Sequence, residues 1–204
     1  MARENAKKRL IVGMSGASGA VYGIRLLEML RPLADIETHL VMSNSAKLNV
    51  KLETDWRVED VEALADEVHD FKDIAASISS GSFKTLGMVV APCSIKTLSG
   101  IAQSYADNLL TRAADVVLKE RRRLVLMVRE TPLHLGHIRA MAQATEAGAI
   151  IMPPVPALYA RPQSVEEIVE HSVARALDLF DLDTGKVRRW GEDVGPDATS
   201  IEKA

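Results

Sequence analysis

The stretch Arg9-Leu10-Ile11-Val12-Gly13-Met14-Ser15-Gly16-Ala17-Ser18-Gly19-Ala20 sets the interpretation of the whole chain. Its first half is a short apolar run, which is typical of a parallel strand covered on both faces. Glycines and serines end that strand, and apolar residues then recur at helical spacing, at Val21, Ile24, Leu27 and Leu30. A strand, a Gly/Ser turn and a helix in this order place backbone N–H groups at a helix N-terminus. Such a terminus favours an anion, for which a phosphate is suited.

Two interpretations of this turn stay open at the level of spacing. The hydroxyls of Ser15 and Ser18 can cap the helix or donate to the same anion. An ordinary strand-to-helix connection with a serine cap explains the pattern as well as a ligand site does. The glycine spacing is not the GxGxxG of dinucleotide-binding folds, so the turn favours a mononucleotide without establishing one.

Length and composition predict one domain of 204 residues, with a core at about 9–182 and a loose C-terminal tail at about 183–204. The hydrophobic fraction of 47% and the charged fraction of 26% are typical of a soluble globular protein. A net charge of -3 argues against a nucleic-acid partner. A single cysteine, Cys93, excludes an internal disulfide and fits a reducing cytoplasm. The polar start of the chain predicts no signal peptide and no membrane span.

Four further strands are expected, at 37–42, 88–91, 123–128 and 149–152. Helical segments follow the first three, and a proline-rich loop at 153–162 separates the last from the final helix. The third of the five should stop at Pro92, because proline has no N–H to donate. A helix is expected over 60–70, and other helices over 108–121 and from the capping-box residue Ser164 to about Phe180. This alternation predicts an α/β fold with a parallel sheet wrapped on both faces. Ligands of such sheets bind outside the carboxyl ends of the strands.

Several polar residues fall at that carboxyl edge, namely Ser18, Ser43, Ser94, Arg129 and the loop before Tyr159. The pair Arg129-Glu130 directly follows a buried strand. An arginine can grip phosphate through two N–H groups, and a partly buried glutamate can have its pKa raised into the acid/base range. This pair is therefore interpreted as functional.

Other clusters have a structural explanation that competes with a functional one. Arg112, Asp115 and Lys119 share one helix face, which is typical of a solvated stripe. His134 and His137 have nearly the His-x-x-His spacing but lack a third ligand, so no metal site is predicted. Cys93 precedes a helix N-terminus without a visible histidine partner, so a small buried residue is the better interpretation.

Nine segments in sequence order resemble the UbiX/Pad flavin prenyltransferases. They are Gly16-Ala17-Ser18-Gly19-Ala20, Glu53-Thr54, Ser80-Gly81-Ser82, Pro92-Cys93-Ser94 with Lys96-Thr97-Leu98, Arg112-Ala113-Ala114-Asp115-Val116, Leu118-Lys119-Glu120-Arg121, Arg129-Glu130, Pro162-Gln163-Ser164-Val165-Glu166 and Arg189-Trp190. Together they span nearly the whole chain, and their order makes the resemblance specific.

The resemblance implies a flavoprotein with a Rossmann-like three-layer α/β/α sandwich and a mostly parallel sheet. Members of the family join the dimethylallyl group of dimethylallyl phosphate to N5 and C6 of reduced FMN, without a metal. The product, prenylated FMN, serves a UbiD-type decarboxylase. The family also implies a homo-oligomer, typically a dodecamer, with active sites near subunit contacts.

The resemblance also assigns residues. It implies FMN contacts by Gly16, Ala17, Ser18, Ser43, Ser94, Ile95, Lys96, Thr97 and Arg129. It implies that the allylic phosphate is held by Lys119, Arg129, Tyr159 and Arg175, with Arg112 lining the site. The catalytic set is Ser18, Glu53, Lys119 and Glu130, in which the two glutamates handle protons and Ser18 orients the flavin. Positions 44 and 96 vary among relatives.

Two alternatives are carried beside this hypothesis. The first is an FMN-dependent cysteine decarboxylase, whose relatives have Pro-Ala-Ser-Ala-Asn-Thr where this chain has residues 92–97, and a histidine near residues 43–45. The second is a non-catalytic subunit that carries flavin for an aromatic acid decarboxylase. A carrier would have no use for Glu53, Lys119, Glu130 and Tyr159, which disfavours it.

Overall fold

The computed structural model of the chain describes residues 7–195, and its backbone divides into two compact units. Unit 1 is Met1–Pro153 and unit 2 is Pro154–Ala204. Each unit is described by itself below. The expected single domain with a loose tail stays a prediction, and residues 196–204 of that tail lie outside the described part.

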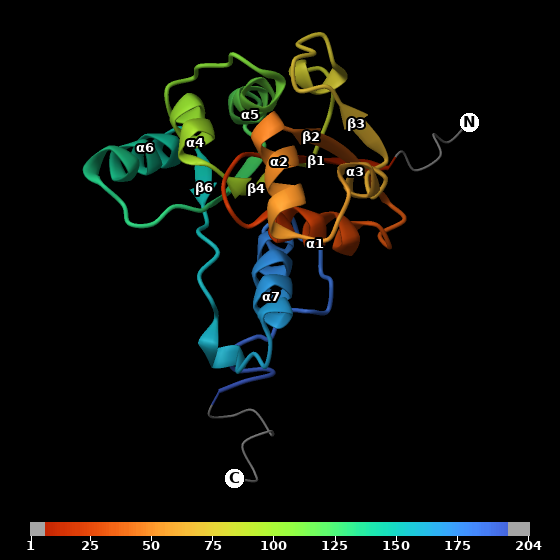
Figure 1. Cartoon of the computed structure of the whole chain (residues 1–204), viewed down its shortest axis with the longest axis vertical. Coiled ribbons are helices and arrows are strands. Elements are labelled where there is room, and N and C mark those ends of the chain that lie inside the picture. The colour runs from red at the N-terminus through yellow and green to blue at the C-terminus, as the bar shows by residue number, and fades with distance from the viewer. Residues whose placement is uncertain (1–6, 196–204) are drawn as a thin grey trace. The chain divides into compact units, whose positions relative to one another are not determined.

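Unit 1 is built on a six-stranded sheet in the order β3-β2-β1-β4-β5-β6, in which every neighbouring pair is parallel (Figure 1). The strands are β1 (Lys8–Met14), β2 (Ile36–Met42), β3 (Glu67–His69), β4 (Gly87–Cys93), β5 (Arg123–Val128) and β6 (Ala149–Ile151). The four central strands are almost wholly buried, which explains their continuous apolar sequence.

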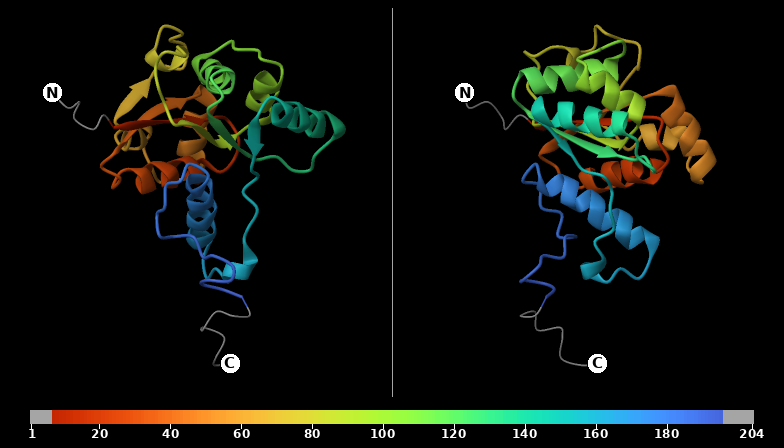
Figure 2. Two further views of the ribbon diagram at one scale, coloured as in Figure 1. Left: turned by 180° about the vertical axis from the view of Figure 1, so that it is seen from behind. Right: turned by 90° about the vertical axis from the view of Figure 1, so that its left-hand side faces the viewer.

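Helices cover both faces of this sheet (Figure 2). On one face lie α4 (Ile95–Ala102), α5 (Leu109–Lys119) and α6 (Leu135–Glu146), and on the other lies α1 (Ala20–Leu30). The remaining helices of the unit are α2 (Asn44–Glu53), α3 (Val58–Glu62) and the short 3-10 helix η1 (Ser77–Ser79). Of these, α2 contacts α1. The Rossmann-like α/β/α prediction is confirmed, and the sheet is parallel throughout.

The strand register defines two edges that matter for the site. β1 ends beside β2, with Met14 paired to Met42, and β4 ends beside β5, with Cys93 paired to Val128. At the opposite, amino edge, Gly87 at the start of β4 pairs with Arg123 at the start of β5. The segments that follow Met14, Met42, Cys93 and Val128 therefore meet at one edge of the sheet, as the sequence predicts.

The expected helix over 60–70 is wrong. The helix α3 ends at Glu62, and the chain then forms β3 beside β2. The cause is a tertiary contact, because Asp66 accepts hydrogen bonds from the N–H (2.8 Å) and hydroxyl (2.9 Å) of Thr38, and its own N–H donates to that hydroxyl (2.9 Å). This contact fixes the segment against β2 and outweighs the helical spacing of its apolar residues.

The expected end of a strand at Pro92 is also wrong, since β4 continues to Cys93 and α4 begins only at Ile95. The pairing of β4 with β5 shifts register between Val90 and Cys93. Proline is tolerated at such an irregularity, where the regular ladder does not require its missing N–H.

Unit 2 contains the 3-10 helix η2 (Leu158–Ala160), the helix α7 (Val165–Asp178) and a returning segment up to residue 195. The predicted cap of α7 is confirmed, because the Ser164 hydroxyl accepts the N–H of Glu167 (3.2 Å). The Glu167 carboxylate bonds the N–H of Gln163 (2.8 Å) rather than that of Ser164. The returning segment is tied to η2 by Arg188, which donates to the carbonyl of Ala160 (2.7 Å).

Across residues 7–195, no helix combines the length and the apolar character required to cross a bilayer. The lone cysteine, Cys93, is fully buried at the end of β4, and this burial raises the pKa of its thiol. Its interpretation as a small core residue is consistent with that environment.

Candidate active site at the carboxyl edge of the sheet

Ser15 joins the ends of neighbouring strands at the carboxyl edge. Its hydroxyl donates to the carbonyl oxygen of Pro92 (3.0 Å) and accepts the backbone N–H of Ser94 (2.8 Å). The N–H of Ser43 donates to the carbonyl of Met14 (3.0 Å). These bonds hold the segments after β1, β2 and β4 side by side, so the residues that follow the three strands form one surface.

Two helices start on this surface with capped N-termini. The hydroxyls of Ser43 and Ser94 each accept the N–H of the third residue of the following helix, at 3.1 and 3.3 Å. The N–H groups of Ile95 and Lys96, in the first turn of α4, find no acceptor within residues 7–195. Unpaired N–H groups at a helix N-terminus suit an anion or the polar edge of a ligand.

The N-terminus of α1 is bound by a carboxylate of the chain itself. Glu53 Oε2 accepts the N–H groups of Gly19 (2.7 Å) and Ala20 (3.0 Å). Gly19 is the N-cap residue, with a φ of 105° that favours glycine, and it makes no side-chain capping bond. The interpretation of Ser15 or Ser18 as the cap of α1 is therefore wrong. The sequence places an anion at this terminus, and in the structure the anion is the Glu53 carboxylate.

The Gly/Ser turn is held by close contacts with α2. A Cβ at Gly16 would lie 2.3 Å from the Cβ of Ser45, so only glycine fits there. The Asn49 amide donates to the carbonyl of Ala17 (2.8 Å). Ser18 remains exposed in this turn, one residue before the Gly19 N–H that binds Glu53. The arrangement brings a hydroxyl and a carboxylate to the same turn.

Arg129 and Glu130 follow β5 at this edge, and both are exposed. The Arg129 guanidinium makes no hydrogen bond or ion pair with any residue of the described range 7–195. Burial raises the pKa of the Tyr22 hydroxyl, and the positive charge of Arg129 opposes that shift, which places the guanidinium near Tyr22. The expectation that Glu130 is partly buried is wrong, because its carboxylate lies in the open and accepts the N–H of Thr131 (3.0 Å).

Lys119 lies at the opposite edge of the sheet. It is the last residue of α5, four positions before Arg123, where β5 begins. Its ammonium donates to Glu120 Oε1 (2.6 Å). Arg112, on the same helix, bonds Asp115 (3.0 Å) and the carbonyl of Ser79 (3.3 Å). Within one chain, Lys119 therefore lies away from the carboxyl edge that carries Ser18, Ser94 and Arg129.

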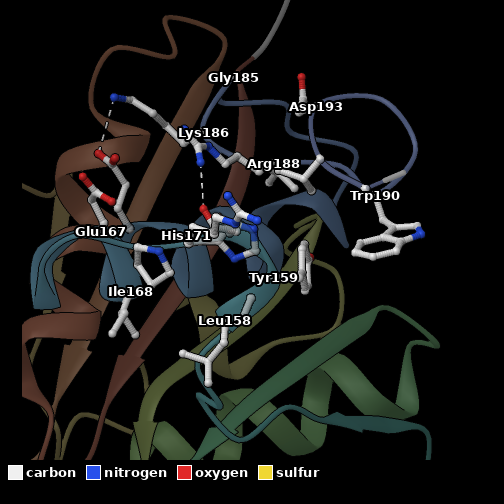
Figure 3. A pocket seen from close by; sticks show the side chains of 18 residues that line it. Leu158, Tyr159, Glu167, Ile168, His171, Gly185, Lys186, Arg188, Trp190 and Asp193 are labelled. Atoms are coloured by element: carbon white, nitrogen blue, oxygen red, sulfur yellow. Dashed lines mark hydrogen bonds and ion pairs between the residues drawn. The ribbon is translucent and has the colours of Figure 1, made fainter. Parts of the chain in front are cut away.

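Tyr159 belongs to unit 2, where it lines a cavity of about 1010 Å³ formed by residues 157–195 (Figure 3). Its ring lies between those of His171 and Trp190, with ring centroids 5.9 Å away in each case and nearly perpendicular planes. Such edge-to-face contacts stabilise aromatic pairs. Arg175, on α7, bonds the carboxylate of Asp178.

The histidine pair shows no metal geometry. His134 caps α6 through its Nδ1, which accepts the N–H of Gly136 (3.0 Å). Its ring contacts that of His137, with centroids 3.6 Å apart and planes tilted by 36°. Within residues 7–195, no group of three or more His, Cys, Asp or Glu side chains is arranged to hold a metal ion.

The structure brings together at one edge of unit 1 the predicted residues Gly16, Ala17, Ser18, Ser43, Glu53, Ser94, Ile95, Lys96, Thr97, Arg129 and Glu130. Lys119 does not lie at this carboxyl edge. Arg112 does not contribute to it either, since its guanidinium bonds the carbonyl of Ser79 in η1. Sequence reasoning missed Ser15 as the link between strands and Asp178 as the partner of Arg175. A signal for Asp178 exists in the Arg-x-x-Asp spacing at the end of α7, which brings the two side chains together on a helix.

Comparisons with known proteins identify the family of this chain. The sequence profile of the Flavoprotein family matches residues 1–177. The flavin prenyltransferase UbiX of Escherichia coli (strain K12) is 69% identical over 173 residues, which cover 85% of this chain and 92% of that protein. The flavin prenyltransferase UbiX of Thauera aromatica is 59% identical over 182 residues, which cover 89% and 93%.

Solved structures give the same result. A crystal structure of AnUbiX (PadA1) in complex with FMN and dimethylallyl pyrophosphate has a TM-score of 0.89 and 54% identity, covering 91% of this chain and 98% of that one. A dodecameric FMN-dependent UbiX-like decarboxylase from Escherichia coli O157:H7 has a TM-score of 0.88 and 53% identity, covering 90% and 100%. The FMN-dependent cysteine decarboxylase SpaF has a TM-score of 0.58 and 21% identity, covering 74% and 86%, and shares the fold alone. The chain therefore belongs to the Flavoprotein family and, within it, to the UbiX-type flavin prenyltransferases.

Proposed function

We propose that this chain joins the dimethylallyl group of dimethylallyl phosphate to N5 and C6 of reduced FMN and releases prenylated FMN and phosphate. The observation that carries this proposal is the likeness to AnUbiX, whose crystal structure holds FMN and dimethylallyl pyrophosphate, over 91% of this chain. The geometry of the carboxyl edge supports it, since a hydroxyl and a carboxylate meet there with a guanidinium and N–H groups that have no partner among residues 7–195.

The carboxyl edge fits FMN. The turn at Gly16 packs against Ser45 of α2 with no room for a side chain, and this contact fixes the backbone of the turn at the carboxyl edge. The N–H groups of Ile95 and Lys96 are unpaired within the described residues and can donate to polar ligand atoms. We assign flavin binding to Gly16, Ala17, Ser18, Ser43, Ser94, Ile95, Lys96, Thr97 and Arg129. Reduced FMN supplies the nucleophilic N5 and C6 atoms when it is bound.

Glu53 is assigned to proton transfer. Its carboxylate is held by two N–H groups at the α1 N-terminus, beside the exposed hydroxyl of Ser18. Closing a new ring at C6 requires the loss of the proton from that carbon, and a positioned carboxylate can accept it. Ser18 orients the flavin, and Glu130, exposed at the same edge, is the second proton-handling residue of the proposal.

The leaving phosphate needs fixed positive charge, because negative charge grows on its oxygen as the allylic bond breaks. We assign this role to Lys119, Arg129 and Arg175. The hydroxyl of Tyr159 is proposed to donate a hydrogen bond to the same phosphate, and Arg112 lines the site. The proposed donor is the monophosphate, although the AnUbiX complex contains the pyrophosphate. A direct comparison of the two donors decides between them.

We further propose that the working form is a homo-oligomer in which copies share their sites. Lys119 lies at the amino edge of the sheet, whereas Glu53 and Ser18 lie at the carboxyl edge, so one chain does not bring them together. A second copy can supply Lys119. The dodecameric state of the UbiX-like protein of Escherichia coli O157:H7 supports such an assembly. A UbiD-type decarboxylase as recipient of the product and a cytoplasmic location complete the proposal.

The test is an anaerobic incubation of the protein with reduced FMN and either dimethylallyl phosphate or dimethylallyl pyrophosphate, followed by mass spectrometry of the flavin. We expect a flavin enlarged by one dimethylallyl unit, and faster formation from the monophosphate. An unchanged flavin, together with release of carbon dioxide from a peptide ending in cysteine, would favour the cysteine decarboxylase alternative instead.

A further inference from the structure

We propose that Asp178 is a positioning residue, which holds the guanidinium groups of Arg175 and Arg189 and thereby fixes Arg175 in the orientation that binds the allylic phosphate. This inference rests on the proposed role of Arg175 in binding the allylic phosphate. Asp178 itself is not placed in contact with the substrate.

Asp178 accepts hydrogen bonds from two arginines, Arg175 and Arg189. Arg189 binds it through both terminal nitrogens, with Nη1 donating to Oδ2 (2.9 Å) and Nη2 donating to Oδ1 (2.8 Å). Arg175 Nη1 donates to the same Oδ2. The bidentate arrangement fixes the plane of the carboxylate, which in turn fixes the direction from which Arg175 approaches.

Burial strengthens this arrangement. The Asp178 side chain is only 13% exposed, whereas that of Arg175 is 43% exposed. The hydrogen bond from Arg189 holds the pKa of Asp178 below its usual range, so the carboxylate stays ionised. Arg175 uses one terminal nitrogen on Asp178, and its other N–H donors have no partner in the described part of the chain. The ionised Asp178 carboxylate therefore holds the more exposed guanidinium of Arg175, which can bind an anion.

The charges in direct contact also point to an anion. Two guanidinium groups share one carboxylate, which leaves one positive charge in excess at this contact. Asp178 is the main cause of the raised pKa of Arg189, and the charges of Asp183 and Glu192 add to it.

Asp178 also acts on the aromatic part of the cavity through Arg189. The backbone of Arg189 is locked in a tight turn, since its N–H donates to Asp193 (2.8 Å) and its carbonyl accepts the N–H of Asp193 (2.9 Å). Trp190 follows directly, and its ring contacts Tyr159 edge to face. The single carboxylate of Asp178 thus connects both unit 2 residues assigned to the phosphate, Arg175 directly and Tyr159 through the Arg189-Trp190 turn.

The experiment compares Asp178→Asn with the wild type in the full protein loaded with FMN. Asparagine keeps the shape but removes the charge that holds the two guanidinium groups. We expect kcat/KM for dimethylallyl phosphate to fall about tenfold or more, with unchanged affinity for FMN. Asp178→Glu restores the charge at a different length and should recover part of the loss. The matched control is Asp60→Asn, which should leave the rate unchanged. Asp60, on α3, pairs with the N-cap residue Arg57 at the same three-residue spacing.

A double-mutant cycle separates positioning from mere stability. If Asp178 acts mainly through Arg175, then Asp178→Asn should cost clearly less in an Arg175→Ala background than in the wild type, because only the route through Arg189 and Trp190 to Tyr159 remains. An equal loss in both backgrounds, or a loss of FMN affinity, would show a structural role only and overturn the inference. Wild-type kinetics in a folded Asp178→Asn protein would also overturn it.

Binding of dimethylallyl phosphate to the protein with oxidised FMN, measured by calorimetry, distinguishes this inference from the proposed function. Weaker binding by Asp178→Asn supports the inference even where the wild type transfers no prenyl group. Unchanged binding and unchanged kinetics, in a wild type that does transfer it, would refute the inference and leave the proposed function intact.

Discussion

At the scale of single residues, Glu53 is the most informative side chain of the site. Its carboxylate takes the place at the α1 N-terminus that the sequence pattern assigns to a phosphate. The physics of the pattern is correct, because unpaired N–H groups at a helix N-terminus attract an anion. The pattern gives no indication that the anion comes from a residue 34 positions further along the chain.

The first prediction follows from this position. Glu53→Gln should bind FMN as the wild type does, since the amide oxygen can still accept an N–H from Gly19. Turnover should fall by about 10²-fold or more, because the amide cannot accept the proton. Flavin titration and the rate of product formation measure the two effects. The control is Glu146→Gln, an exposed position on α6, and a wild-type rate in Glu53→Gln would exclude the proposed role.

Sequence reasoning missed two functional residues for the same reason. Ser15 and Asp178 act through contacts that depend on the folded backbone. Ser15 belongs to no motif with its own spacing rule, and the Arg-x-x-Asp spacing pairs Asp178 with Arg175 without indicating its bonds from Arg189. Ser15 reaches Ser94 across 79 positions. Glu130 was expected to be partly buried because it follows a buried strand, yet the strand ends before it. Position after a strand therefore predicts the edge on which a residue lies but not its burial.

At the scale of elements, the strand-to-helix junctions carry the site. Ser43 and Ser94 cap helices that start at the carboxyl edge, and Ser164 caps α7 in the same manner. The sequence predicts these elements well where the apolar period is long and capped. The sequence prediction fails for residues 60–70, where hydrogen bonds between Asp66 and Thr38 fix the chain beside β2 as the strand β3. No local sequence pattern indicates this strand.

The second prediction compares two of these caps. Ser94→Ala and Ser164→Ala each remove a hydroxyl that accepts a helix N–H, so each should lower the free energy of unfolding by about 1 kcal/mol. Only Ser94→Ala should weaken FMN binding, because Ser94 lies at the carboxyl edge and Ser15 binds its N–H. Denaturant unfolding and flavin titration measure both effects. Equal FMN affinity in the two variants would remove Ser94 from the flavin site.

At the scale of the whole molecule, the separation of Lys119 from Glu53 is the main result. Family resemblance assigns both residues to one reaction, yet they lie at opposite edges of the same sheet. Sequence patterns place residues on elements, but they cannot say whether one copy or two copies complete a site. In a closed homo-oligomer, the surface of one copy that carries Lys119 can complete the active site on a neighbouring copy that carries Glu53.

The most direct test of the account uses two inactive variants, Glu53→Gln and Lys119→Ala, carrying different affinity tags and expressed together. Mixed assemblies are purified through both tags and assayed for prenylated FMN under anaerobic conditions. With random mixing, about a quarter of the sites should receive an intact Glu53 from one copy and an intact Lys119 from another, so activity should return. Each variant alone should stay inactive while the wild type is active. Mixed assemblies as inactive as the single variants would contradict a shared site, and a wild type that leaves the flavin unchanged would contradict prenyl transfer itself.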